Sequence, residues 1–258
     1  MYLAIPKENI NGETRVAATP GTIKDLIKSG MEVYVESKAG QNSYFSDQEY
    51  KDAGANIVES EDELLSQADV IIKVLAPSNE QVLKIKPNAA IISFCQTTRE
   101  LDTVKAMRDR SLTGFSMHLV PRTTLAQKMD ALSSQANIAG YKSVLMAASR
   151  LSVYMPLLMT AAGTIRPAKV LVLGAGVAGL QAIATAKRLG AQVEAFDVRP
   201  VVKEQVESLG AKFIQVEAGE DEGVGEGGYA KETSDEYKRL QQQLIHDHIS
   251  KADVVITT

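Results

Sequence analysis

Residues 169–179 read KVLVLGAGVAG, and the architecture of the C-terminal half follows from them. The apolar run 170–173 predicts a buried parallel strand, and the glycine segment after it leads into a helix expected over residues 178–189. In a G-x-G-x-x-G segment the first glycine permits a tight turn, the second lets backbone approach a pyrophosphate, and the third lets helix pack closely on strand. The helix start adds free N–H groups and partial positive charge. We therefore predict a dinucleotide-binding turn made of Gly174, Gly176, Val177, Ala178 and Gly179.

An acidic residue follows the glycine segment at the distance that dinucleotide binding requires. The strand expected over residues 192–196 ends at Asp197, whose carboxylate can accept a hydrogen bond from a ribose 2′-hydroxyl and would repel a 2′-phosphate. NAD(H) is therefore favoured over NADP(H). Arg199 lies close by and weakens this preference, and we count it among the candidate cofactor-binding residues. The alternative interpretation is a purely structural glycine-rich turn.

Strands and helices alternate along both halves of the chain. In the first half we expect strands over residues 2–5, 32–36, 56–58, 70–75, 89–94 and 112–116, and helices over residues 22–28, 47–53, 61–67 and 101–110. From residue 192 we expect strands over residues 192–196, 212–215 and 253–257, and helices over residues 202–209 and 235–249. Such alternation predicts an α/β protein with two doubly wound parallel-sheet domains, the second a Rossmann dinucleotide-binding domain.

The predicted domains are an N-terminal α/β domain over residues 1–125 and a linker helix plus Rossmann domain over residues 126–258. The last predicted strand, 253–257, has no covering helix after it. A six-stranded nucleotide-binding fold needs more chain than this. We therefore expect the second domain to be incomplete at its C-terminal end.

Composition narrows the class of function. The chain has 258 residues, a formal net charge of −4 and no tract rich in lysine or arginine, which argues against nucleic acid as a partner. Its three histidines and one cysteine show no metal-ligand spacing, so we predict no metal site. Cys95 lies in an apolar run and is expected to be a buried core thiol.

The most apolar stretch of the sequence is residues 144–165. Arg150 and Pro156 interrupt it before it reaches the roughly 20 residues that a membrane-spanning helix needs. We interpret it as a buried helix between the domains and its exit loop. Any membrane role would then come through a partner.

Two further segments carry candidate site residues. Residues 122–151 are expected to be largely helical, and their start places Arg122, Gln127 and Asp130 within three helical turns. Such a set could hold a carboxamide and a nearby pyrophosphate or ribose, although spacing alone favours an ordinary solvated helix start. Residues 217–229 form a loop rich in glycine and acids, in which Tyr229 is the large group that could reach a nucleotide. A lid and a plain surface loop are equally good interpretations of that loop.

Several segments together resemble one enzyme family. They are IPKENINGETRVAATP (5–20), RTTLAQKMDALSSQANIAGY (122–141), VLGAGVAGLQAIATAKRLGAQVEAFDVRP (172–200), GGYAKE (227–232) and ADVVITT (252–258). They resemble the NAD(H)-binding domain of the proton-translocating nicotinamide nucleotide transhydrogenases. The resemblance covers essentially the whole chain. The wider superfamily includes alanine dehydrogenase.

The resemblance implies a function and a set of partners. The chain would bind NAD(H) and exchange hydride directly with NADP(H) on a partner domain, as a Re/Si-specific enzyme whose membrane domain translocates protons. It would form a homodimer and lie on the cytoplasmic face of the bacterial inner membrane, held there by its partner subunits. Arg122, Gln127, Asp130 and Ser133 would surround the nicotinamide end, Asp197 would hold the adenosine ribose, and Tyr229 would lie on a loop that closes over the nucleotide.

Two other functions stay open at this point. Alanine dehydrogenase resembles this chain at Arg15 and Lys73, which in that family meet the substrate, but it also uses a histidine near the strand that here ends in Gln96. An amide cannot act as a general acid or base near neutral pH, whereas hydride exchange between two nicotinamides asks for no proton transfer. The third hypothesis is an NAD-sensing module without catalytic activity.

Overall fold

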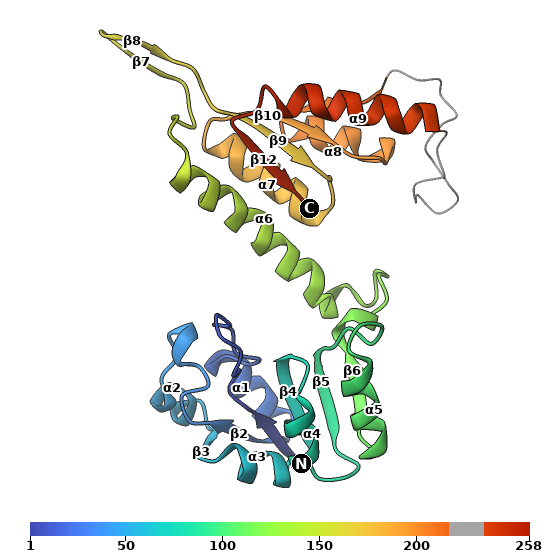
Figure 1. Ribbon diagram of the computed structural model, residues 1–258. Helices are drawn as coiled ribbons and strands as arrows, with labels where there is room; N and C mark the ends of the chain where they lie inside the picture. The colour runs from blue at the N-terminus through green and yellow to red at the C-terminus, as the bar shows by residue number, and fades with distance from the viewer. Residues whose placement is uncertain (217–234) are drawn as a thin grey trace. The chain divides into compact units, whose positions relative to one another are not determined.

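The computed structural model describes residues 1–216 and 235–258 (Figure 1). The chain divides into unit 1, Met1–Asp130, and unit 2, Ala131–Thr258. Each unit has a main sheet whose strands are all parallel, with α-helices in the connections between them. The predicted fold class, α/β with two parallel sheets and a Rossmann-like second one, is confirmed.

Unit 1 is built on six parallel strands in the order β3-β2-β1-β4-β5-β6. The strands are β1 (Tyr2–Ile5), β2 (Glu32–Glu36), β3 (Asn56–Val58), β4 (Val70–Leu75), β5 (Ala90–Phe94) and β6 (Thr113–Ser116). The helices are α1 (Pro20–Lys28), α2 (Asp47–Asp52), α3 (Glu61–Gln67), α4 (Asn79–Lys84) and α5 (Leu101–Asp109), with short 3₁₀ turns η1 (Gln41–Ser43) and η2 (Met117–Leu119). The strand order reverses between β1 and β4, which makes their carboxyl ends the switch point of the sheet.

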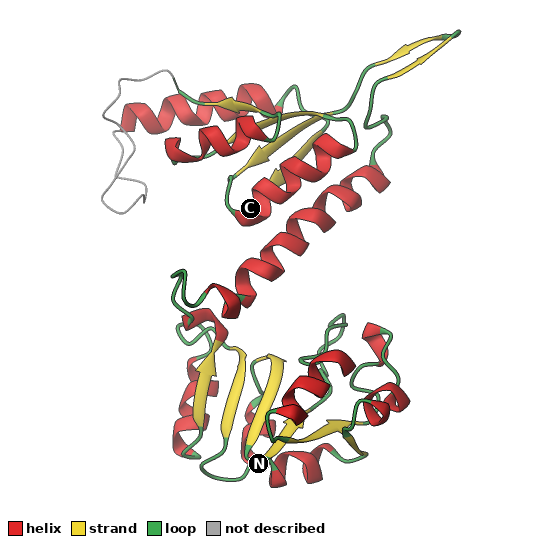
Figure 2. Cartoon of the chain, turned by 180° about the vertical axis from the view of Figure 1, so that it is seen from behind, coloured by secondary structure: helices red, strands yellow, loops and turns green. Residues whose placement is uncertain are grey.

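Helices close both faces of this sheet (Figure 2). Side chains alternate between the faces along each strand, so Leu3 and Ile5 pack into one core with Tyr50 of α2. Ala4 packs into the other core, which Leu64 of α3 and further residues of α4 and α5 complete. All of these side chains are buried, and the sheet is thereby held rigidly enough to position the loops at its carboxyl edge.

Unit 2 is built on four parallel strands in the order β11-β10-β9-β12. They are β9 (Lys169–Leu173), β10 (Gln192–Phe196), β11 (Lys212–Ile214) and β12 (Val254–Thr257). The helices are α6 (Ala131–Arg150), α7 (Val177–Arg188), α8 (Lys203–Ser208) and α9 (Asp235–Ile249), with 3₁₀ turn η4 (Pro200–Val202) before α8. One core joins the sheet to α7 and α8, and a smaller one joins its other face to α9.

Helix α6 packs against α7 at a close backbone contact. A Cβ on Gly140 would overlap the carbonyl oxygen of Ala178, so only glycine allows this approach. Of the 20 residues of α6, Gly140 and Val144 are the ones buried. The expectation of a buried helix over this apolar stretch is therefore wrong, because most of its side chains are partly or fully exposed.

A β-hairpin stands where the sequence suggested an exit loop. Strands β7 (Leu158–Thr160) and β8 (Gly163–Ile165) pair antiparallel, and every residue of both strands is exposed. The hairpin projects away from the sheet of unit 2 (Figures 1 and 2). In the part of the chain that the structure describes, no helix is long and apolar enough to cross a membrane.

Candidate functional site

The glycine segment lies between β9 and α7, at the switch point of the unit 2 sheet. Gly174 has φ of 99°, a conformation that side chains disfavour. A Cβ on Gly179 would overlap the carbonyl oxygen of Gly174, so the strand-to-helix turn requires glycine there. A Cβ on Gly176, in contrast, would meet no atom within 4 Å. The turn itself does not need this second glycine, and the bare backbone is open to a ligand from that side.

The start of α7 provides hydrogen-bond donors for an anion. Gly176 is the N-cap residue and makes no side-chain cap. The ladder of intrahelical hydrogen bonds begins at the Leu180 N–H, which donates to Gly176 O at 2.8 Å. The N–H groups of the preceding turn have no partner further back in a helix. Together with the helix dipole they make a site suited to phosphate oxygens.

Asp197 follows β10 and lies beside this turn. It is 9% exposed, and its Oδ2 accepts a hydrogen bond of 2.7 Å from the Ala175 N–H. Arg199 donates to the same carboxylate from its backbone N–H at 2.8 Å and from its guanidinium at 3.0 and 2.9 Å. Burial acts to raise the pKa of Asp197, but these hydrogen bonds outweigh it and the pKa is lowered. The carboxylate is therefore ionised at neutral pH and adjoins the glycine turn.

Arg122, Gln127 and Asp130 line one hollow of about 270 Å³ in unit 1. They do not lie on a regular helix, as the sequence suggested, since α6 begins only at Ala131. Consecutive turns and the 3₁₀ turn η3 (Gln127–Met129) bring them together instead. Asp130 ends that turn with ψ of 76°, outside the helical region. A guanidinium, an amide and a carboxylate thus share one polar hollow.

The remaining predicted residues lie elsewhere. Ser133 is in the first turn of α6 and is partly exposed. Tyr229 lies outside the described residues, as does the rest of the loop over residues 217–229. The binding roles given to Ser133 and Tyr229 stay predictions.

Unit 1 carries a buried ion pair at its own switch point. The Lys73 ammonium on β4 lies 3.4 Å from Glu8 Oε2, and these side chains are 4% and 3% exposed. Glu8 Oε1 accepts from the Val74 N–H at 2.7 Å, and Gln81 accepts from Lys73 at 3.3 Å. Sequence reasoning named Lys73 but missed Glu8 and Gln81. A lysine inside an apolar strand was the available signal, because a buried cation needs a buried partner.

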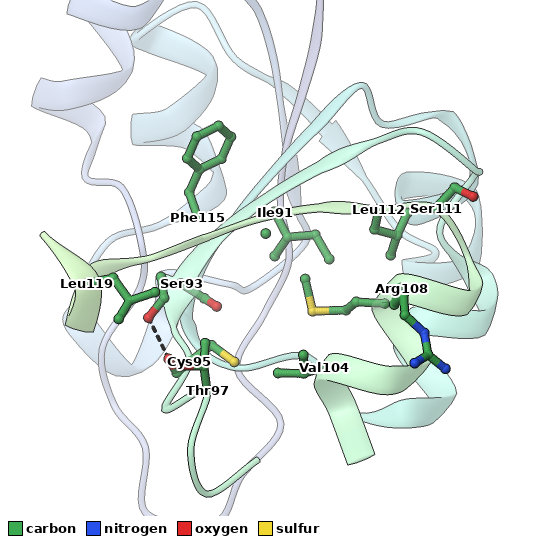
Figure 3. A pocket seen from close by; sticks show the side chains of 13 residues that line it. Ile91, Ser93, Cys95, Thr97, Val104, Arg108, Ser111, Leu112, Phe115 and Leu119 are labelled. Carbon is green, nitrogen blue, oxygen red and sulfur yellow. Dashed lines mark hydrogen bonds between the residues drawn. The ribbon is translucent and has the colours of Figure 1, made fainter. Parts of the chain in front are cut away.

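A more apolar hollow of about 420 Å³ lies between β5, α5 and β6 (Figure 3). Figure 3 shows the Cys95 sulfur directed toward Val104 inside it. Burial, followed by the charge of Glu100, raises the pKa of the Cys95 thiol to about 11, so the thiol is protonated at neutral pH. The expectation of a buried, unreactive core thiol is confirmed. None of the predicted site residues lines this hollow.

A histidine lies closer to the end of β5 than the sequence suggested. Gln96 does follow this strand, but the ring of His118, in η2, packs edge-on against Phe94 with 5.8 Å between ring centroids. The carboxyl ends of neighbouring parallel strands meet at one sheet edge, so a residue 22 positions later along the chain returns to the same place. The interpretation that no histidine lies in this neighbourhood is wrong.

Comparisons with known proteins cover both halves of the chain. Residues 4–139 match the family described as alanine dehydrogenase/PNT, N-terminal domain, and residues 143–258 match its C-terminal domain. The chain is 46% identical over 267 positions to the first of the separately encoded parts of the NAD(P) transhydrogenase subunit alpha of Rhodospirillum rubrum, covering all of this chain and 69% of that protein. It is 43% identical over 258 positions to the NAD(P) transhydrogenase subunit alpha of Haemophilus influenzae, of which it spans 50%.

Solved structures agree with these matches. The crystal structure of a transhydrogenase from Sinorhizobium meliloti superimposes with a TM-score of 0.87 at 43% identity, over all of this chain and 69% of that one. An L-alanine dehydrogenase superimposes with a TM-score of 0.74 at 26% identity, over 83% of this chain and 60% of that one. The chain therefore belongs to the alanine dehydrogenase/PNT family, and its whole length is similar to the NAD(P) transhydrogenase alpha subunits within it.

Proposed function

We propose that this chain is the NAD(H)-binding component of a proton-translocating NAD(P) transhydrogenase. The observation that carries the proposal is the glycine turn of unit 2, where an open main chain, an uncapped helix start and the ionised Asp197 meet. These groups fit a pyrophosphate and an adenosine ribose. The names of the transhydrogenase relatives supply the reaction class.

In this proposal each part of the site has a separate task. The start of α7 binds the pyrophosphate, Asp197 binds the ribose, and Arg122, Gln127, Asp130 and Ser133 hold the nicotinamide end. The nicotinamide supplies the hydride chemistry, and the acceptor is NADP⁺ on a partner domain. Because no proton is exchanged at that step, the chain has to position the ring and exclude water rather than supply an acid–base pair. A membrane partner on the cytoplasmic face would couple the transfer to proton movement.

The test is a reconstitution with an NADP(H)-binding component. We expect hydride transfer from NADH, and we expect Gln127→Asn to slow it at least about tenfold while NADH affinity changes little, because a small displacement of the ring costs rate more than binding. Gln48→Asn makes the same change at an exposed glutamine of α2 and should leave both quantities unchanged. Equal loss of rate and affinity in Gln127→Asn would remove Gln127 from the proposed site.

Alanine dehydrogenase is the second candidate, because the structure places His118 beside the end of β5. That reaction moves a proton as well as a hydride, so it needs a titratable group such as histidine. If the chain is a transhydrogenase component, His118→Asn keeps the hydride-transfer rate within about twofold, since no proton is exchanged at that step. Formation of NADH that depends on alanine and is lost in His118→Asn would favour the second candidate. NADH binding without either activity would favour a sensor.

The β7–β8 hairpin supports the homodimer that belongs to this proposal. Leu158, Met159 and Ile165 are 37%, 71% and 49% exposed. A two-stranded hairpin is marginally stable in water by itself, and exposed apolar side chains of this size mark contact surfaces. A second copy of the chain would cover them. Sedimentation should show a dimer for the wild type and a monomer for Met159→Glu, and an unchanged dimer would place the contact elsewhere.

A further inference from the structure

We propose that Arg199 sets the dinucleotide selectivity of unit 2 by competing with the adenosine ribose for Asp197. The inference rests on the proposed function, since it concerns the same site. It starts from an observation that the sequence could not provide. The carboxylate predicted to bind the ribose is already fully occupied by donors from this chain.

The hydrogen bonds account for every acceptor position of the Asp197 carboxylate. Oδ1 accepts from the Arg199 backbone N–H at 2.8 Å and from its Nε at 3.0 Å. Oδ2 accepts from the Ala175 N–H at 2.7 Å and from an Arg199 terminal nitrogen at 2.9 Å. A carboxylate has about four lone-pair sites. A ribose hydroxyl can therefore reach Asp197 only when the guanidinium leaves it.

Of the two partners, Arg199 is the one that can move. The side chain of Asp197 is 5% exposed, and the glycine turn holds it through the Ala175 N–H. The side chain of Arg199 is 38% exposed, and its guanidinium can turn into solvent without disturbing the core. Binding of the ribose thus exchanges one partner of Asp197 for another, and the two backbone N–H donors remain in place.

The displaced guanidinium gains a second role when the ribose carries a 2′-phosphate. Arginine presents a planar fork of donors that matches phosphate, and an arginine near this position accommodates the 2′-phosphate of NADP in related folds. The same side chain that opposes an unmodified ribose would therefore favour a phosphorylated one. The pair makes the chain select NAD(H) less strictly than Asp197 alone would.

Titration of the full chain with NADH and NADPH at several salt concentrations tests this role. The wild type should bind NADH tightly and NADPH weakly, with the NADPH affinity falling more steeply with salt because it depends on an exposed charge. Arg199→Leu should bind NADH about twofold to fivefold more tightly, the factor expected for releasing a partly exposed ion pair. It should bind NADPH at least about tenfold more weakly, as loss of a charged hydrogen bond predicts. The preference for NADH therefore rises by more than about tenfold.

Two further variants keep the test decisive. Arg188→Leu removes an exposed arginine at the far end of α7 and should change neither affinity. Arg199→Lys keeps the cation without the forked contact, and should retain NADPH binding within about threefold should Arg199→Leu fail to fold.

The proposal is overturned if folded Arg199→Leu binds NADH more weakly than the wild type, or if the preference is unchanged. Loss of NADPH binding in Arg199→Lys, or a wild type that binds NADH but no NADPH, also overturns it. A wild type that binds no NADH contradicts the proposed function instead.

Discussion

Unit 1 and unit 2 share the strand order around their switch points but differ in the connection after the first strand. The order β3-β2-β1-β4 of unit 1 corresponds to β11-β10-β9-β12 of unit 2. After β9 the chain turns through three glycines and enters α7 at Val177. After β1 it continues without a helix until Pro20, and Glu8 from this connection is buried against Lys73. One switch point presents open N–H groups, and the other is closed by an ion pair.

The difference shows that sheet topology alone does not make a dinucleotide site. A crevice at the switch point is available in both units, but its chemistry depends on the connection that fills it. The glycine turn leaves the start of a helix accessible. The Lys73–Glu8 pair satisfies its own charges internally, at the cost of burying both. Variants that alter one unit at a time test this difference.

Gly179→Ala should have the largest effect, because its methyl group would overlap the carbonyl oxygen of Gly174. We expect unit 2 to lose about 3 kcal/mol or more of stability and NADH binding to become undetectable. Gly176→Ala meets no atom, so it should keep full stability and still weaken NADH binding at least about tenfold by blocking the phosphate. Thermal unfolding and NADH fluorescence measure the two quantities. Normal binding by Gly176→Ala would show that the phosphates lie elsewhere.

Lys73→Met should destabilise unit 1 by about 3–5 kcal/mol, because it leaves the Glu8 carboxylate buried without its cation. The double variant Lys73→Met/Glu8→Gln removes both charges and should recover much of the loss. NADH affinity of the folded variants should stay within about threefold of the wild type, since Asp197 and the glycine turn are untouched. Denaturant unfolding is the measurement. Wild-type stability in Lys73→Met would mean that the pair contributes nothing.

Asp197→Ala should weaken NADH binding about tenfold and relax the preference over NADPH, since a charged hydrogen-bond acceptor is lost. The pKa of Asp197 is lowered, so its stabilising contacts are present above the ordinary aspartate pKa and are lost as pH falls through the lowered value. The NADH affinity of the wild type should therefore not change with Asp197 ionisation between about pH 5 and 8. An unchanged preference in Asp197→Ala would exclude Asp197 as a determinant of selectivity.

The smallest effect is expected at the Arg166–Asp253 pair, which joins the chain after the hairpin to the start of β12. Hydrogen bonds from Arg166, then from the Lys169 N–H, lower the pKa of Asp253 to about 2. The pair therefore stabilises unit 2 above the ordinary aspartate pKa, and this contribution is lost as pH falls toward 2. Arg166 is 59% exposed, so solvent screens it strongly. Arg166→Met should lower the unfolding temperature slightly at pH 7 and not at pH 2, and a larger loss at pH 2 would reverse the assigned sign.

Elements that follow from local patterns could be predicted from the sequence. The apolar runs of β4 and β9 and the glycines after β9 lie where the residues indicated, because strand period and turn geometry are short-range properties. Helix α4 was missed, although Ser78 and Gln81 form a capping box at its start. The β7–β8 hairpin was missed because its apolar residues continue the apolar pattern of α6.

Features that join distant parts of the chain could not be predicted in the same way. The contact between Glu8 and Val74 spans 66 positions, and that between Ala175 and Asp197 spans 22. No residue pattern shows that Arg199 already fills the carboxylate expected to bind the ribose. The hollow around Arg122, Gln127 and Asp130 also depends on turns rather than on helical spacing. Tertiary placement decides such contacts.

Amide chemical shifts of the ¹⁵N-labelled chain during titration with NADH test the central comparison most directly. If the pyrophosphate binds at the start of α7, the largest changes occur at the amides of Gly176, Val177 and Ala178, and those of Lys7 and Glu8 beside the ion pair of unit 1 stay in place. Changes centred on Lys7 and Glu8, with the α7 amides unmoved, would contradict the assignment of the dinucleotide site to unit 2.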